Sequence, residues 1–206
     1  MIGSAILLAA AISAPALEQR DLRFFERYPT WAVREGKSSG AFVDIIVEAD
    51  GKVRSCTVVS FVGDERLANE ECSQFERLRF LPAKGPDGKP ILGNYRTYVS
   101  RFVQGSAQRA QVERTTQPPD IRLSVARLPD DAEVLEFGVD VLVDAGGVVQ
   151  LCNVGSRTQS PADMSFVEQA CDEAANSTHA LLAGPDGMAS SYVKNLKVRF
   201  ELASPT

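Results

Sequence analysis

The chain has 206 residues, with 22 Lys or Arg against 27 Asp or Glu and a formal net charge of −5 at pH 7. It contains no basic run with interleaved aromatics, so a nucleic-acid backbone would find no electrostatic partner, and the negative sign also disfavours adsorption to an anionic membrane. At this length either one domain of ordinary size or two small domains are possible.

The first 16 residues are almost wholly apolar and end in Ala14-Pro15-Ala16, which fits the small-x-small pattern of a secretory cleavage site. We therefore expect a signal peptide over residues 1–16. An uncleaved anchor is the competing interpretation, but the apolar run stops at Glu18, short of the roughly 20 residues that span a bilayer. Cleavage and export would place the chain in an oxidising compartment, where cysteines form disulfides, with no membrane span after cleavage.

An internal repeat divides the rest of the chain into two copies, at residues 17–103 and 120–206. Residues 104–119 are polar, lack an apolar period and end in Pro118-Pro119, as is typical of a linker. An aspartate, a glycine and a cysteine of the first copy recur in the second copy at one constant separation. A later cysteine and a Gly-Pro-Asp-Gly turn recur at a slightly longer separation. The pairs are Asp44 and Asp140, Gly51 and Gly147, Cys56 and Cys152, Cys72 and Cys171, and Gly85-Pro86-Asp87-Gly88 with Gly184-Pro185-Asp186-Gly187.

Each copy begins with a predicted β-hairpin. In the first, alternating apolar residues from Ala41 lead to Asp50-Gly51, a two-residue turn in which glycine tolerates positive φ. This turn fixes the register and sets Ile45 opposite Cys56 and Val43 opposite Val58. The same argument for Gly146-Gly147 sets Val141 opposite Cys152 and Val139 opposite Val154. Both hairpins thus place a cysteine on the core side of the sheet.

A helix follows each hairpin, over residues 65–79 in the first copy with Asp64 as its N-cap. Ala68, Cys72, Phe75 and Leu78 form its buried stripe. In the second copy Ser160-Pro161 begins a helix whose stripe contains Cys171. Because both helix cysteines face the sheet, we favour Cys56 with Cys72 and Cys152 with Cys171 among the three possible connectivities. Neither pair has the close spacing of a zinc or redox motif.

A closing strand is predicted after each Gly-Pro-Asp-Gly turn, over residues 94–103 and 192–202. Together with Tyr28-Pro29, Phe80-Leu81-Pro82-Ala83 and Arg101-Phe102, the order of these elements resembles the TonB C-terminal domain family. The first copy matches over its full length, and the second is more diverged. The resemblance implies an α+β fold of two tandem domains, each a small three-stranded antiparallel sheet (hairpin, helix, closing strand) with helices on one face. In that family the domain couples a membrane motor to receptors by pairing with an extended receptor segment. The resemblance also implies a periplasmic or secreted bacterial protein.

The expected activity is therefore binding, because the chain lacks the long arm and retained anchor that force transduction needs. An extended partner segment would add to the edge of a closing strand. The candidate residues on the two strands are Tyr95, Thr97, Val99 and Arg101, and Lys194, Leu196, Val198 and Phe200. The alternative is a disulfide-stapled structural pair without peptide binding, whose edges pair with each other in an intramolecular pseudo-dimer or a homodimer.

Catalysis is not expected. His179 is the only histidine and falls near a predicted helix end, where a structural role suits it. The sequence has no nucleophile elbow, phosphate-binding loop or metal-ligand motif, so we expect no cofactor and no metal. Asp44 and Asp140 lie in mid-strand on the face away from the predicted core. We interpret them as gatekeepers against aggregation in preference to ligand contacts.

Overall fold

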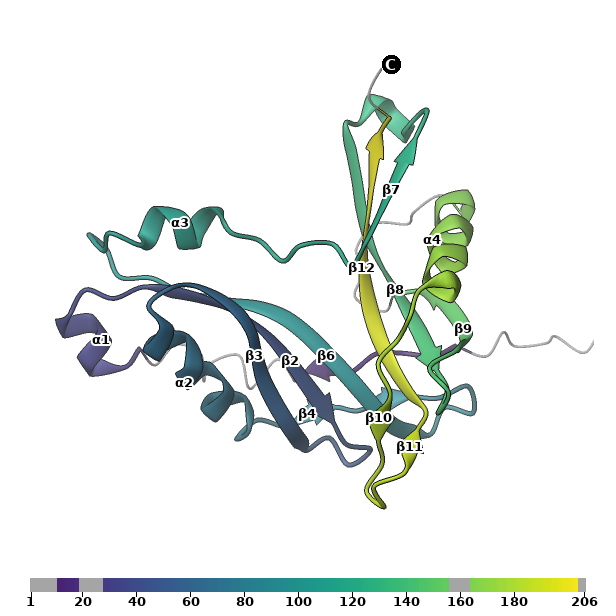
Figure 1. The fold of residues 1–206 in the computed structure, drawn as a ribbon, viewed down its shortest axis with the longest axis horizontal. Coiled ribbons are helices and arrows are strands. Elements are labelled where there is room, and N and C mark those ends of the chain that lie inside the picture. The colour runs from purple at the N-terminus through teal and green to yellow at the C-terminus, as the bar shows by residue number, and fades with distance from the viewer. Residues whose placement is uncertain (1–10, 19–27, 156–163, 204–206) are drawn as a thin grey trace, which may run out of the picture.

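The computed structural model describes residues 11–18, 28–155 and 164–203. The first ten residues of the predicted signal peptide and the Ser160-Pro161 helix start lie outside these ranges. Most of the described chain belongs to one eight-stranded mixed sheet with helices packed on it, so the fold is α+β (Figure 1). Within the described residues, no helix is both long enough and apolar enough to cross a membrane.

The first half has the predicted order of hairpin, helix and closing strand, but the helix ends at Phe75 and not at residue 79, and the closing strand begins at Pro90 and not at residue 94. Its elements are β2 (Ser39–Val47), β3 (Val53–Gly63), α2 (Glu65–Phe75) and β6 (Pro90–Arg101). Strand β2 pairs antiparallel with both β3 and β6. The predicted register is confirmed, with Ile45 opposite Cys56 and Val43 opposite Val58. The carboxylate of Asp64 accepts a hydrogen bond from the backbone N–H of Leu67, which confirms the predicted N-cap of α2.

The second half repeats this order. Its elements are β8 (Val134–Val143), β9 (Val149–Val154), α4 (Met164–Asn176) and β12 (Tyr192–Leu202). Here too the register is as predicted, with Val141 opposite Cys152 and Val139 opposite Val154. The bounds of β12 are those expected from its alternating pattern.

Short elements complete the two halves. Strand β5 (Ala83–Lys84) pairs with the start of β6, and β10 (Leu182–Ala183) pairs with β11 (Ala189–Ser190). Strand β4 (Phe80–Leu81) pairs with β1 (Ala16–Leu17). A one-turn helix α1 (Thr30–Arg34) precedes β2, and a 3-10 turn, η2 (Pro129–Asp131), precedes β8.

The two halves are joined through their closing strands, in the order β3-β2-β6-β12-β8-β9. Strands β6 and β12 run parallel and pair over three residues, with Val193 opposite Gly93 at the centre. We call this pairing the seam. The prediction of two separate three-stranded sheets is therefore wrong. A closing strand at the edge of such a sheet leaves a row of unpaired N–H and C=O groups, and the seam satisfies part of both rows at once.

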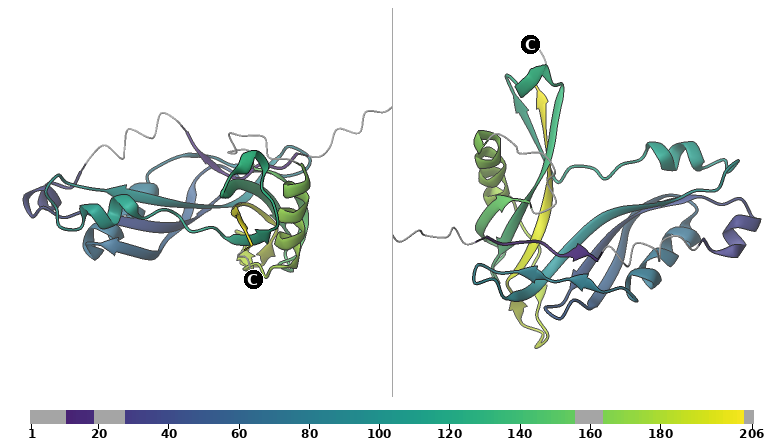
Figure 2. Two further views of the ribbon diagram at one scale, coloured as in Figure 1. Left: turned by 90° about the horizontal axis from the view of Figure 1, so that it is seen from above. Right: turned by 180° about the vertical axis from the view of Figure 1, so that it is seen from behind.

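The predicted helices lie on opposite faces of this continuous sheet. Ile45 packs in the core under α2, with Ala68 and Phe75, whereas its neighbour Ile46 packs against the core under α4, with Val167 and Ala170. Successive residues of a strand point to opposite faces. The halves are thus related by an approximate two-fold axis along the strands at the seam, and they diverge from it in a V (Figures 1 and 2).

The expected linker has structure of its own. It contains α3 (Arg109–Arg114), whose Val112 is fully buried. The hydroxyl of Tyr98 on β6 donates to the carbonyl oxygen of Val112 over 3.0 Å, which ties the helix to the first half. The chain then enters β7 (Ile121–Val125), which pairs parallel with β12. One buried side chain in a polar stretch gives no apolar period, so the sequence pattern did not indicate this helix.

Both predicted disulfides are present. Cys56 bonds to Cys72 and Cys152 to Cys171, with Cα atoms 5.4 and 5.7 Å apart. Each bond fastens the second hairpin strand to the helix above it, in line with the facing of cysteines derived from the hairpin register. Two intramolecular disulfides are consistent with an oxidising, extracytoplasmic compartment.

Candidate functional site

Most of the eight candidate edge residues point into the protein. Tyr95 packs edge-on against Phe80, with ring centroids 5.1 Å apart, and Arg101 is 4% exposed and ion-paired with Glu71. On β12, Leu196, Val198 and Phe200 belong to the core under α4. Lys194 is half-buried, and this burial lowers the pKa of its ammonium. Thr97 and Val99 are half-buried. A partner at these strands would therefore meet mainly backbone.

The edge of β12 away from β8 is covered at both ends and at Lys197. Residues 192–194 pair with β6, and residues 198–202 pair with β7. Between them, the backbone N–H of Lys197 donates to the carboxylate of Asp120, and the carbonyl oxygen of Lys197 accepts from the backbone N–H of Asp120, both over 2.8 Å. An added strand has no place on this edge.

The corresponding edge of β6 is only partly covered. Strands β5 and β12 pair with it as far as Asn94, and within the described ranges no strand pairs with residues 96–100 on that side. A polar cavity of about 200 Å³ lies where β6 and β12 separate, lined by Arg96, Thr97, Asn195 and Lys197 among others. Arg96 is held there by Asp44 and Asp120, at 2.7 and 2.9 Å. We call residues 96–100 the open edge.

The repeated aspartates are both bonded across to the closing strand. Asp44 faces Arg96, and Asp140 faces Asn195. The two sites differ in exposure, because the Asp44 side chain is 25% exposed whereas Asp140 is fully buried. A buried carboxylate is costly unless it is hydrogen-bonded. Their interpretation as surface gatekeepers therefore does not fit Asp140.

The second partner of Asp140 comes from the predicted signal peptide. The backbone N–H of Ala14 donates to Oδ2 of Asp140 over 3.1 Å. Residues 12–17, which we call the docked segment, cross the sheet on the face that α4 leaves uncovered (Figure 2, right). The side chains of Ile12 and Ala14 are 3% and 4% exposed, and they pack with Ala83 and Val193.

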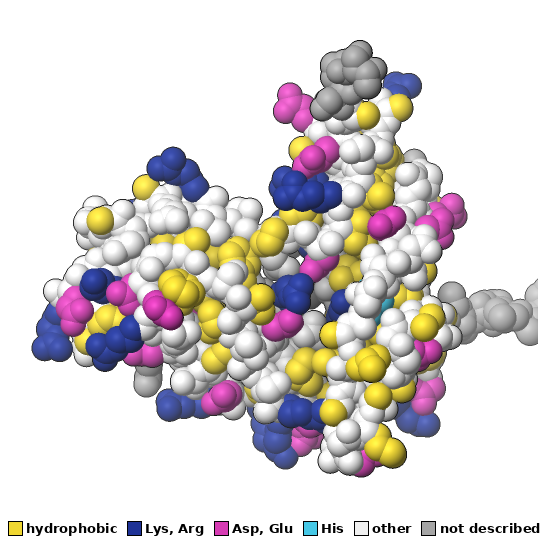
Figure 3. Space-filling view, viewed as in Figure 1, with side chains coloured by type: hydrophobic (Ala, Val, Ile, Leu, Met, Phe, Trp, Pro, Cys, Tyr) yellow, Lys and Arg dark blue, Asp and Glu magenta, His cyan; other side chains and the backbone are white. Residues whose placement is uncertain are grey.

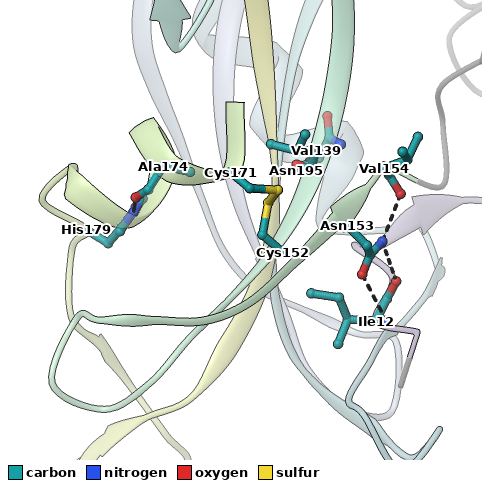
Figure 4. Close-up of a disulfide and its surroundings, with 9 residues drawn as sticks. All are labelled: Ile12, Val139, Cys152, Asn153, Val154, Cys171, Ala174, His179 and Asn195. Atoms are coloured by element: carbon teal, nitrogen blue, oxygen red, sulfur yellow. Dashed lines mark hydrogen bonds between the residues drawn. A yellow bond between two sulfur atoms is a disulfide. The ribbon is translucent and has the colours of Figure 1, made fainter. Parts of the chain in front are cut away.

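Both ends of the docked segment are fixed by further contacts. At its start, the amide of Asn153 on β9 exchanges two hydrogen bonds with the backbone of Ile12, at 3.3 and 3.4 Å (Figure 4). In its middle, Ser13 and Lys84 exchange two backbone hydrogen bonds, at 3.2 and 2.9 Å. Its end is β1, which pairs antiparallel with β4.

Glycine at position 93 makes room for Pro15. A Cβ atom placed on Gly93 would lie 2.3 Å from Cγ of Pro15, well inside van der Waals contact. The groove beneath the docked segment is therefore formed by both halves: β4, β5 and Gly93 from the first, Asp140, Asn153 and Val193 from the second. Sequence reasoning missed this site, although the polar residue in mid-strand at position 140 was a signal of it.

His179 has a structural environment. It is 6% exposed and follows α4, where its Nε2 lies 2.8 Å from the carbonyl oxygen of Ala174. A carbonyl only accepts, so Nε2 carries the proton. Burial lowers the pKa of this imidazole, which favours its neutral form. The position at a helix end agrees with the sequence, but the side chain acts there as a neutral donor.

On the face of the molecule in Figure 3, basic and acidic side chains are interspersed. Among the described residues, no group of three or more His, Cys, Asp or Glu is placed to hold a metal ion. Comparison of the chain with protein-family models, with curated proteins and with solved structures finds no match.

Proposed function

We propose that this protein is a non-enzymatic binding or adaptor module of the bacterial periplasm, which takes an extended segment of a partner protein at a sheet edge. The observation that carries the proposal is the open edge, residues 96–100 of β6, which in the described chain have no strand on the side away from β2. Backbone groups of such an edge can bind an added strand, with affinity from main-chain hydrogen bonds.

Two further features support this function. The order of hairpin, helix and closing strand resembles TonB C-terminal domains, in which an extended receptor segment is bound. The disulfides make each hairpin and helix a stiff unit in an oxidising compartment, and stiff binding surfaces lose less entropy on association. The open edge is also short, so that the partner would contribute one strand of a few residues.

The alternative function is structural: a disulfide-stapled pair that binds no peptide. The observation in its favour is the coverage of most of the β12 edge by β6, Asp120 and β7. A chain that closes one edge internally has the usual defence against unwanted pairing.

Amide hydrogen exchange, measured on the complex with a captured partner, distinguishes the binding function from the structural function. A partner is first captured from periplasmic extract, and amide exchange is then compared between the free and bound protein. Binding at the open edge should slow outward-facing amides of residues 96–100 and leave residues 198–202 of β12 unchanged, because β7 already covers them. Protection that spares residues 96–100 would contradict the proposal, and the absence of any captured partner would favour the structural alternative.

A further inference from the structure

The groove beneath the docked segment has the features of a peptide-binding site that is filled by the chain itself. Its floor is apolar, from Ala83 and Val193, which are fully buried and pack with Ile12 and Ala14 of the segment. Its polar groups are placed to bind main chain: the carboxylate of Asp140, the amide of Asn153 and the backbone of Lys84. Of the hydrogen bonds that these groups make to residues 12–14, every one goes to a backbone atom of the segment.

The docked segment is also one that the chain is expected to lose from the groove. It lies within the predicted signal peptide, and cleavage after Ala16 would remove residues 12–16 from the groove. The carboxylate of Asp140 would then lose the donor at Ala14, and the apolar floor would be uncovered. Both changes cost free energy that a new extended segment could recover.

We propose that this groove is a binding site for an extended peptide of another polypeptide, with small apolar residues and a proline at the position of Pro15. The peptide would run antiparallel to β4 and β5 as the docked segment does. Asp140 would accept from the N–H of the residue before the proline, and Gly93 would provide the space for the ring. This site lies over the seam itself, whereas the open edge lies beyond the seam on β6, and each of the two sites can fail independently.

The specificity of the groove for its peptide comes from the space beside Gly93 and from the buried carboxylate of Asp140. A proline has no N–H of its own, so at position 15 no donor is lost in the contact with Gly93. The residue before it donates to a buried carboxylate, and hydrogen bonds to charged groups are about twice as strong as neutral ones. Side chains larger than alanine at position 14 would meet the floor that Ala83 and Val193 form.

The test uses the full chain, folded with both disulfides and carrying a site-specific protease sequence within residues 19–27. After cutting, the chain's own segment can exchange with a fluorescent peptide of residues 11–17. We expect saturable binding to the cut protein and none to the uncut protein, whose groove is filled. A peptide N-methylated at Ala14, which cannot donate to Asp140, should bind at least tenfold more weakly.

Matched variants assign the site. Asp140→Asn should weaken peptide binding about tenfold or more, in line with the loss of a charged acceptor. Asp44→Asn changes the equivalent aspartate in the first half, which does not touch the segment, and should leave binding unchanged. Circular dichroism tests whether each cut protein keeps its fold, and thiol titration tests whether it keeps its disulfides.

Three outcomes would overturn the proposal. One is no exchange with the peptide, as measured by native mass spectrometry of the cut protein. Another is loss of the fold on cutting, which would make the segment an integral part of the core. The third is a dimer of uncut chains that exchange their segments, since the occupant would then be a second copy.

Discussion

Asn195 lies directly opposite Asp140 on the neighbouring strand, and its side-chain amide donates to Oδ1 of Asp140 over 2.7 Å. In the first half the equivalent pair is Asp44 and Arg96. Both halves therefore have an aspartate that is bonded to the residue opposite it on the closing strand. In the first half this pair is an accessible ion pair, and in the second half it is a buried hydrogen bond.

Replacing the donor in the buried pair should cost more stability than replacing the cation in the accessible pair. Asn195→Ala removes a donor from a fully buried carboxylate, and we expect a loss of about 1–3 kcal/mol in the free energy of unfolding. Arg96→Ala acts on side chains that are 41% and 25% exposed, and the loss there should stay below about 1 kcal/mol. Urea denaturation of both variants measures the difference. Equal losses would mean that burial of Asp140 does not govern the energetics.

The ion pair of Glu71 and Arg101 is the most buried in the described chain, at 1% and 4% exposure. Glu71→Ala removes the carboxylate that pairs with the guanidinium of Arg101 in the core of the first half, where Arg101 also donates to Gln74, and we expect about 3–5 kcal/mol of destabilisation. The exposed pair of Lys89 and Asp87 is the control, and Lys89→Ala should leave the urea midpoint unchanged. A small effect of Glu71→Ala would show that water reaches Arg101 in solution.

His179 should make stability depend on pH. Folding lowers the pKa of its imidazole by burial, so the unfolded chain takes up a proton more readily than the folded one. Its contribution to stability is therefore complete above an ordinary pKa of about 6.5 and is lost as the pH falls through the folded value. Urea midpoints measured between pH 8 and pH 5 should fall in the wild type.

The control for this pH dependence is His179→Gln, whose amide can still donate toward Ala174 but does not titrate. Because the chain has one histidine, the variant should have a flatter profile in the same range. Parallel profiles for the two proteins would assign the pH dependence to carboxylates instead.

The two disulfides should contribute similarly. They close loops of sequence separation 16 and 19, for which chain entropy gives about 3 kcal/mol each. The double variants Cys56→Ser with Cys72→Ser, and Cys152→Ser with Cys171→Ser, should each lose about that amount in urea denaturation. In the denatured wild type, a thiol reagent should find no reactive thiol before reduction and four after it. A reactive thiol before reduction would contradict complete pairing.

Local rules were sufficient for each half of the sheet. The two-residue turns set the hairpin registers, alternation set the bounds of β12, and facing cysteines gave both disulfides. The N-cap at Asp64 followed from its position before a helical stripe. All of these depend on residues close together in sequence.

Contacts between distant segments could not be derived in this way. The seam joins Gly93 to Val193, and neither residue carries a signal that names the other. The docked segment has the composition of a signal peptide, so its apolar residues had a sufficient explanation without the groove. The position of Asp140 in mid-strand is unusual in the sequence, but its role depends on a hydrogen bond to a segment more than a hundred residues away.

The shortness of the seam bears on how the protein unfolds. Three residue pairs join the halves across β6 and β12, and Leu92 and Ile46 of the first half pack in the core under α4. Otherwise each half has its own apolar core and its own covalent cross-link. We expect limited cooperativity between the halves once the docked segment, which contacts both, is released. Removal of a few N-terminal residues would then turn one unfolding transition into two. While it is bound, the docked segment would couple the two halves so that they unfold together.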